Sequence, residues 1–136
     1  MKNVLYIIWN DENDLGIPII DEQHKGIVSI INSLYFFMQN GDGEDELLHI
    51  IDLLDKYIKV HFKTEEALIK KALFPGCEKH LLMHKEFFKK MQKIRAEALT
   101  TNEPKNLLSF LRSWWLEHIK KEDIKYVPFV MNTLEK

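Results

Sequence analysis

The sequence predicts an all-α fold: an antiparallel up-down four-helix bundle with an extended N-terminal arm and a short C-terminal helical segment. Four stretches repeat apolar residues at the spacing of a helix. Short segments of turn-forming residues separate them, and short connections favour antiparallel neighbours. No stretch alternates polar and apolar residues as a strand would. A length of 136 residues, 46% of them hydrophobic, suits a single domain over residues 1–136.

Capping and breaking residues set the expected boundaries of these elements. Asp21 is the expected N-cap of the first helix, QNGDGE at 39–44 ends that helix, and FPG at 74–76 ends the second. TTNEP separates the third helix from the fourth and places Pro104 in the first turn of the fourth. The expected elements are an arm over 1–20, helices over about 21–39, 45–72, 77–99 and 104–123, and a tail over 124–136.

Composition excludes several classes of partner. The formal net charge is -2 and the basic residues are scattered, so the sequence indicates neither a nucleic-acid-binding surface nor a polybasic membrane patch. The N-terminal apolar run is too short for a signal or membrane-spanning segment, and we expect a cytoplasmic protein. The single cysteine, Cys77, agrees with a reducing compartment and excludes a cysteine-based metal cluster within one chain. Any bound metal would need nitrogen and oxygen ligands.

Histidines on the inward stripes of the helices are the most informative residues. In HFKTEE, His61 and Glu65 lie one helical turn apart, as His80 and His84 do in KHLLMH, so each pair projects onto one patch. Any one such histidine could be a core residue with an ordinary hydrogen-bond partner, but five buried imidazoles would each need a partner. A shared metal site explains them together, because neutral imidazole suits first-row transition metals. The candidate ligands are His24, His61, His80, His84 and His118.

Two carboxylates, Glu65 and Asp123, accompany these imidazoles. Carboxylates can bridge metal ions, and the donor set is too large for one tetrahedral zinc, so the sequence predicts two ions. Glu66 points about 100° away from Glu65 on an ideal helix and is interpreted as a solvated charge. His118 and Asp123 would be about 140° apart on such a helix, so we predict a wide turn or a helix end that brings them together.

Other kinds of metal site fit the sequence less well. His49 lies about 120° from His61 around the same helix, so we expect it on the outside, with no role. It completes the one Glu-x-x-His of the chain, at Glu46, whereas carboxylate-rich di-iron bundles need two such motifs. A zinc hydrolase is also disfavoured, because Leu81 follows His80 where the zinc-protease helix carries its catalytic glutamate.

The same segments carry a resemblance to a known family. WNDENDLGIPIIDEQH resembles an entry arm followed by a first histidine ligand, and HFKTEE resembles a His-Phe-x-x-Glu element. FPGCEKHLLMH resembles an aromatic-Pro loop followed by His-x-x-x-His, and HIKKED resembles His-Ile-x-x-x-Asp. In order and spacing these elements are similar to those of the hemerythrin family, in particular the single-domain bacteriohemerythrins. The match spans most of the chain and fills all seven ligand positions.

This resemblance implies reversible dioxygen binding, for carriage, storage or sensing, at a non-haem centre of two iron ions joined by an oxo or hydroxo bridge. It assigns His80, His84 and His118 to one iron, His24 and His61 to the other, and Glu65 and Asp123 to bridging positions. The position for dioxygen is expected on the iron with two histidines. An enzyme is not expected, because no obvious acid, base or nucleophile remains near the cluster once the ligands are assigned.

Apolar residues near the ligands are expected to line the vacant side of the centre and to keep it dry. They are Ile27, Phe62, Trp114, Trp115 and Ile119. Simple core packing would explain each of these residues equally well. At Trp115 the chain departs from the Trp-Leu that is usual in the family, so a larger ring could narrow the pocket.

Two questions of function stay open on the sequence alone. The alternative to dioxygen binding is a di-iron enzyme or an iron-handling protein, which would use the same centre to reduce peroxide or nitric oxide or to store iron. Dioxygen is the expected partner. Sensing through a separate, unidentified protein partner is also compatible with the sequence.

Overall fold

The computed structural model describes residues 5–40 and 44–134, which form helices and turns and no strand, so the all-α fold class is confirmed. The long helices are α1 (Pro18–Asn40), α2 (Glu44–Lys71), α3 (Cys77–Thr101) and α4 (Lys105–Trp114). The shorter elements are η1 (Asp11–Asn13), η2 (Trp115–Glu122), η3 (Asp123–Tyr126) and α5 (Val127–Leu134). No helix within the described ranges is long and apolar enough to cross a bilayer.

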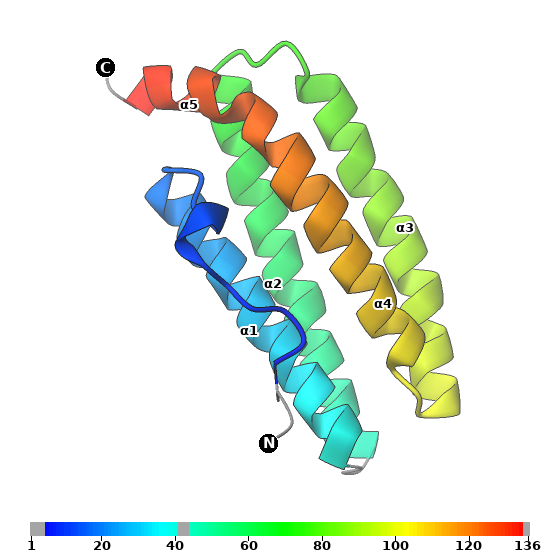
Figure 1. Ribbon diagram of the computed structural model, residues 1–136. Helices are drawn as coiled ribbons and strands as arrows, with labels where there is room; N and C mark the ends of the chain where they lie inside the picture. The colour runs from blue at the N-terminus through cyan, green and yellow to red at the C-terminus, as the bar shows by residue number, and fades with distance from the viewer. Residues whose placement is uncertain (1–4, 41–43, 135–136) are drawn as a thin grey trace.

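The four long helices alternate in direction and close into a ring. α1 packs against α2 and α4, and α3 packs against the same two helices. Figure 1 shows η2 and η3 continuing α4, and α5 lying across the end of the bundle near the connection between α2 and α3. Because of the alternation, the start of α1, the end of α2, the start of α3 and the segment after α4 all meet at that end.

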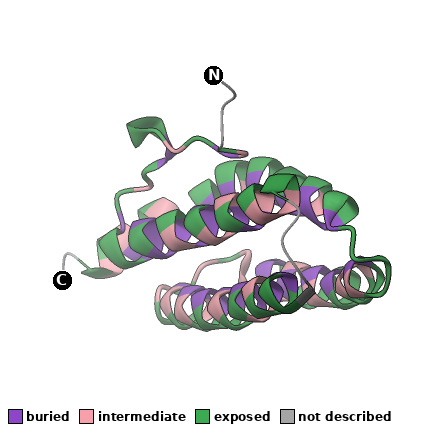
Figure 2. Ribbon diagram, turned by 90° about the horizontal axis from the view of Figure 1, so that it is seen from below, coloured by how far each residue is buried: buried purple, intermediate pink, exposed green. Residues whose placement is uncertain are grey.

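Burial follows the helical stripes that the sequence predicts. In Figure 2 the buried residues face inward between the helices and the exposed residues cover the outer faces. The larger apolar cluster fills most of the bundle and includes the predicted lining residues Ile27, Phe62, Trp114, Trp115 and Ile119. A smaller apolar cluster closes the end near α5 and consists of Ile17, Ile20, Ile69, Tyr126 and Val130.

The first helix starts earlier than predicted, and the prediction of Asp21 as its N-cap is wrong. α1 begins at Pro18, whose fixed φ angle suits the first position of a helix. Asp21 lies inside the first turn, where its carboxylate accepts backbone hydrogen bonds from Leu15 (2.7 Å) and Gly16 (3.1 Å). This side chain therefore ties the N-terminal arm to α1. Pro104 also differs slightly, since it precedes α4 instead of lying within its first turn.

Candidate metal centre

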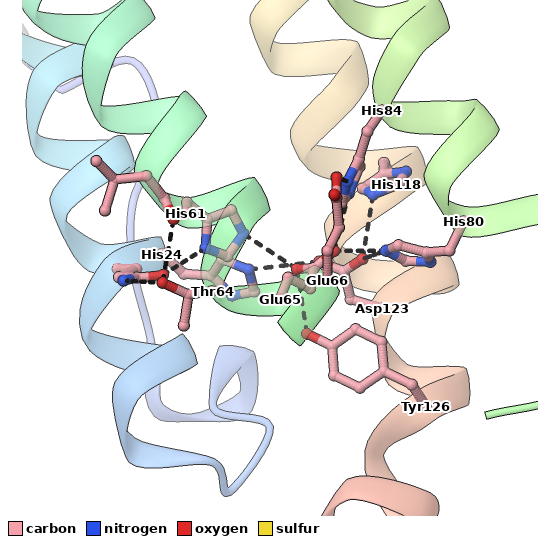
Figure 3. Close-up of polar contacts among 12 residues, drawn as sticks. His24, His61, Thr64, Glu65, Glu66, His80, His84, His118, Asp123 and Tyr126 are labelled. Atoms are coloured by element: carbon pink, nitrogen blue, oxygen red, sulfur yellow. Dashed lines mark hydrogen bonds and ion pairs between the residues drawn. The ribbon is translucent and has the colours of Figure 1, made fainter. Parts of the chain in front are cut away.

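The structure brings all seven predicted ligands together inside the bundle. They point toward one another from four sides (Figure 3), and His118, the most exposed of them, is only 8% exposed. α1 contributes His24, α2 contributes His61 and Glu65, α3 contributes His80 and His84, and the segment after α4 contributes His118 and Asp123. His49, expected on the outside, is exposed.

The ligand atoms form two overlapping groups. One group is Glu65, His80, His84 and His118, and the other is His24, His61, Glu65 and Asp123. Within each group the potential ligand atoms all lie within 4.8 Å of one another. Nitrogen and oxygen ligands bind transition metals at about 2.0–2.2 Å, so atoms this close together can share one ion. Glu65 belongs to both groups.

The Glu65 carboxylate divides its two oxygens between the groups. Its Oε1 lies 2.5 Å from His80 Nε2 and 2.9 Å from His84 Nε2. Its Oε2 lies 3.1 Å from His61 Nε2. Such a carboxylate is placed to bridge two cations.

The Asp123 carboxylate repeats this division from the opposite helix. Its Oδ1 lies 3.2 Å from the Nε2 atoms of both His80 and His118. Its Oδ2 lies 3.4 Å from His24 Nε2. Two carboxylates therefore connect the same pair of imidazole groups.

The predicted wide turn between His118 and Asp123 is confirmed. Residues 115–122 form a π-helix, in which hydrogen bonds span five residues instead of four, and the Asp123 N–H donates to the His118 carbonyl. Residues five apart then lie above one another, so both side chains face the cluster. The α-helical part of the predicted fourth helix consequently ends at Trp114.

Buried polar atoms that have no hydrogen-bond partner indicate whether the side chains of the cluster are suited to bind cations. The buried atoms without a hydrogen-bond partner include Nδ1 and Nε2 of His24, Nε2 of His61, Nε2 of His118 and both carboxylate oxygens of Asp123. A buried polar atom left unsatisfied costs about 1–3 kcal/mol. All of these atoms except His24 Nδ1 belong to the short contacts within the cluster, where cations would give their lone pairs partners. The donor set therefore fits metal ions.

The electrostatics of the cluster agree with a cation site. Burial opposes ionisation of Glu65, but its contacts with the imidazoles, His61 above all, hold the pKa of its carboxyl well below the usual value. Burial and the charge of Glu65 oppose ionisation of Asp123, yet contacts with imidazoles lower its pKa too. Burial lowers the pKa of His80, but Asp123 and Glu65 raise it to about 10. The ionised carboxylates thus hold a proton on His80 where a metal ion would replace it.

Gln23 orients one of these imidazoles and was missed by the sequence analysis. His61 Nδ1 lies 2.9 Å from Gln23 Oε1, to which its N–H can donate. Gln23 Nε2 donates in turn to Thr64 Oγ1 at 3.0 Å. This chain of hydrogen bonds fixes the His61 ring so that Nε2 faces Glu65. The available signal was a polar residue next to His24 on a helix whose buried face is mainly apolar.

The interpretation of Glu66 as a solvated charge is wrong. Its Oε2 lies 2.8 Å from His84 Nδ1, and its side chain is only 29% exposed. Glu66 can therefore accept the N–H of His84, which leaves the Nε2 lone pair of that ring for the cluster. The helical geometry of α2 alone could not reveal this contact, because the partner residue lies on α3.

Tyr126 is the third residue that the sequence analysis missed. It is fully buried, and its hydroxyl donates to Glu65 Oε2 at 3.2 Å. Its ring meets the His80 ring nearly edge-on, with centroids 5.6 Å apart. Burial and the charge of Glu65 raise the pKa of the Tyr126 hydroxyl, so it keeps its proton and remains a donor.

Aromatic rings cover the imidazoles on the side of the larger apolar cluster. The ring pairs are Phe62 with His84, Trp114 with His118 and Trp115 with His24. Phe62 stacks closely, with centroids 3.6 Å apart, whereas Trp115 meets His24 edge-on at 5.8 Å and has Trp9 beside it at 5.6 Å. Ile27 and Ile119 are buried in the same apolar cluster. This side of the candidate centre is therefore mainly apolar.

Fold and site together define a helical-bundle protein with a buried candidate centre for two cations. Comparison with protein families places it further: the family model described as "Hemerythrin HHE cation binding domain" matches residues 15–130. The chain belongs to the hemerythrin family.

Relatives span nearly the whole chain. A protein of Clostridium acetobutylicum named bacteriohemerythrin is 30% identical over 126 residues, which cover 88% of this chain and 98% of that protein. A bacteriohemerythrin of Pseudomonas aeruginosa is 31% identical over 130 residues, which cover 95% of this chain and 84% of that protein. Myohemerythrin-1 of Phascolopsis gouldii is 25% identical over 119 residues, 88% of this chain and 90% of that protein.

Solved structures support the fold. The crystal structure of a wild-type hemerythrin superposes with a TM-score of 0.81 at 24% identity and covers 92% of this chain and 98% of that one. A leucine-to-alanine mutant of hemerythrin gives a TM-score of 0.82, also at 24% identity, with coverage of 93% and 98%. At this identity the likeness concerns the arrangement of the helices alone.

Proposed function

We propose that this chain binds dioxygen reversibly at a non-haem di-iron centre. The observation that supports the proposal most directly is the position of the two carboxylates: Glu65 and Asp123 each direct one oxygen to each of two imidazole groups. Paired metal ions in proteins lie about 3.5–4 Å apart, a separation that a carboxylate can bridge. The resemblance of the chain to the hemerythrins supports iron as the metal and dioxygen as the ligand.

The proposed ligands divide unequally between the two ions. They are His80, His84 and His118 for one ion, His24 and His61 for the other, and Glu65 and Asp123 for both. The group with fewer imidazoles is the one that has room for a small ligand. When bound, the two ferrous ions supply the electrons that dioxygen binding requires. The chain orients the imidazoles through Gln23 and Glu66 and excludes water with its aromatic rings.

Rapid mixing of the diferrous protein with dioxygen tests this proposal. The chain is reconstituted with ferrous iron without air, its iron content is measured, and the visible spectrum is followed after dioxygen is added. Reversible binding predicts two irons per chain and a spectral change that disappears when dioxygen is removed. Rapid irreversible oxidation, or repeated turnover of peroxide or nitric oxide, would instead support the enzymatic alternative.

Gln23→Leu is expected to weaken the binding of one metal ion and not of the other. The substitution leaves the buried Nδ1–H of His61 without an acceptor, and loss of such a partner typically costs about 10–100-fold in metal affinity. Competition with a chromophoric chelator should therefore resolve one weakened site and one unchanged site. Gln39→Leu, at an exposed position on the same helix, serves as the control. Equal weakening of both sites would contradict the assigned role.

Trp115→Leu is expected to speed dioxygen association and autoxidation roughly tenfold, which is about 1.4 kcal/mol of barrier. The indole ring lies edge-on against His24, so a smaller side chain opens space beside the group proposed to bind dioxygen. The cavity should also lower the free energy of unfolding by about 1–3 kcal/mol. Stopped-flow rates measure the first effect and denaturant unfolding the second. Trp9→Leu is the control, because Trp9 touches Trp115 from the side of the arm. Unchanged rates in Trp115→Leu would show that this ring does not limit access.

A further inference from the structure

A cavity of about 250 Å³ lies outside the candidate metal centre, between the N-terminal arm and the segment where α4 passes into η2. Its charged lining residues are Arg112 and Lys120, and none of the described residues that line it is acidic. Asn10 and Asn13 contribute polar groups, and the remaining lining residues are apolar or aromatic. The cavity thus combines positive charge with apolar walls.

The two cations in this cavity lack the ion pairs that some other basic residues of the chain make. The second arginine of the chain, Arg95, pairs with Asp52 and with Asp55 at 3.2 Å. Arg112 and Lys120 have no carboxylate within 4.0 Å among the described residues, although Lys121, next to Lys120, pairs with Glu117. The Arg112 guanidinium instead lies over the Tyr6 ring, 5.3 Å from its centroid. That contact positions the group while its N–H donors stay free.

Hydrogen bonds hold the wall formed by the arm in place. Asn32 on α1 accepts from the backbone N–H groups of Tyr6 and Ile7, both at 2.8 Å, and donates to the Ile7 carbonyl at 2.8 Å. Asn10 and Asn13 cap η1 reciprocally, since each side-chain oxygen accepts from a backbone N–H of the same short helix turn. A cavity with fixed walls needs little ordering when a ligand enters.

Acidic residues near Lys120 indicate that an anionic group would bind at Arg112 instead. An adjoining cavity of about 70 Å³ is also lined by Lys120 and includes Glu12 and Asp14. Lys120 therefore faces carboxylates on one side, and Arg112 does not. Arg112 also presents a planar fork of donors that matches a carboxylate or phosphate.

We propose that this cavity is a binding site for a small organic anion, a carboxylate or phosphate monoester attached to a flat apolar ring. The anionic group binds at Arg112, and the ring packs against the apolar wall to which Trp115 and Ile7 contribute. The volume admits a single substituted ring and is too small for a typical drug-sized ligand, whose pockets begin near about 300 Å³. The larger cavity along α1, about 520 Å³, is a weaker candidate, because Lys25, the one charged residue among the described residues that line it, offers a point charge instead of a planar fork of donors.

Calorimetric titration of the metal-loaded protein tests the site with four probes: benzoate, phenyl phosphate, inorganic phosphate and benzyl alcohol. The two aromatic anions should bind saturably at millimolar concentration or below. Inorganic phosphate, which lacks the ring, and benzyl alcohol, which lacks the charge, should bind about tenfold more weakly or not at all. Failure of both aromatic anions to bind, or equally tight binding of inorganic phosphate, overturns the proposal.

Substitution of Arg112 tests whether the anion binds at this residue. Arg112→Met should lower the affinity for benzoate about tenfold or more, because it removes the donor fork and keeps most of the side-chain volume. Lys105→Met removes one positive charge from an exposed position on the same helix and should leave the affinity unchanged. Equal affinities in the two variants, at unchanged circular dichroism and metal content, would overturn the assignment. Dioxygen binding is not needed for this result, so it stands or fails independently of the proposed function.

Discussion

Glu65→Ala is expected to strip iron from both metal positions. Glu65 is the residue common to the two groups of ligand atoms, and its oxygens contact three different imidazoles. Without it, each proposed ion loses a ligand and the bridge between the ions is removed. His80, whose pKa Glu65 helps to raise, also loses a charge partner, and breaking such a buried pair costs about 3–5 kcal/mol. Iron analysis, the visible spectrum and denaturant unfolding measure these effects.

Two comparison variants separate this effect from a general loss of folding. Glu46→Ala removes an exposed carboxylate from the same helix and should leave iron content and stability unchanged. His61→Ala should lower the iron content mainly at the group of His24 and His61, with exposed His49 as its matched control. Full iron content with an unaltered spectrum in Glu65→Ala would falsify the bridging assignment.

Removal of the metal is expected to lower the melting temperature by about 10–20 °C. Ions that bind only the folded chain stabilise it by about 4 kcal/mol at a thousand times their dissociation constant, and about 3–5 °C per kcal/mol follows for a chain of this size. The metal-free chain must keep ionised carboxylates, a protonated His80 and unsatisfied polar atoms in its interior. Calorimetric melting before and after chelation measures the difference.

Adding single metals back to the chelated chain shows which kind of ion stabilises it. Ferrous iron or another first-row metal added to the chelated chain should restore the melting temperature, because imidazole suits these ions. Magnesium should not restore it, because this ion prefers oxygen ligands and retains its water. A melting temperature that does not respond to chelation, with the iron fully removed, would contradict a stabilising role of the ions.

Helical spacing predicted the candidate centre because its residues repeat along single helices. His61 and Glu65 share one face of α2, and His80 and His84 share one face of α3, so each pair could be placed without knowledge of the neighbouring helix. The five-residue step from His118 to Asp123 contradicted a regular helix and indicated a wide turn or a helix end, and the structure has a π-helical turn there. The assignment of all seven residues as metal ligands remains a prediction.

Contacts between different helices were not predictable in the same way. The roles of Gln23 and Glu66 depend on which helix packs beside theirs, and hydrogen bonds between helices leave no periodic pattern in the sequence. Tyr126 joins the centre only because α5 folds across the end of the bundle. Asp21 resembled an N-cap, but Pro18 begins the helix earlier and frees that carboxylate to bind the arm.

Two hydrogen-bond patterns compete in the segment after Trp114: the observed π-helical pattern and the α-helical one. Its hydrogen-bond pattern is rarer than that of an α-helix, so local preference favours rewinding to the tighter form. The proposed binding of metal ions by both His118 and Asp123 would favour the wider form. Without bound metal ions, a change to the α-helical pattern would rotate Asp123 about 140° away from His118 and would move the segment of Tyr126 with it. A single hydrogen-bond pattern thus determines both whether Asp123 faces inward and where Tyr126 lies relative to Glu65.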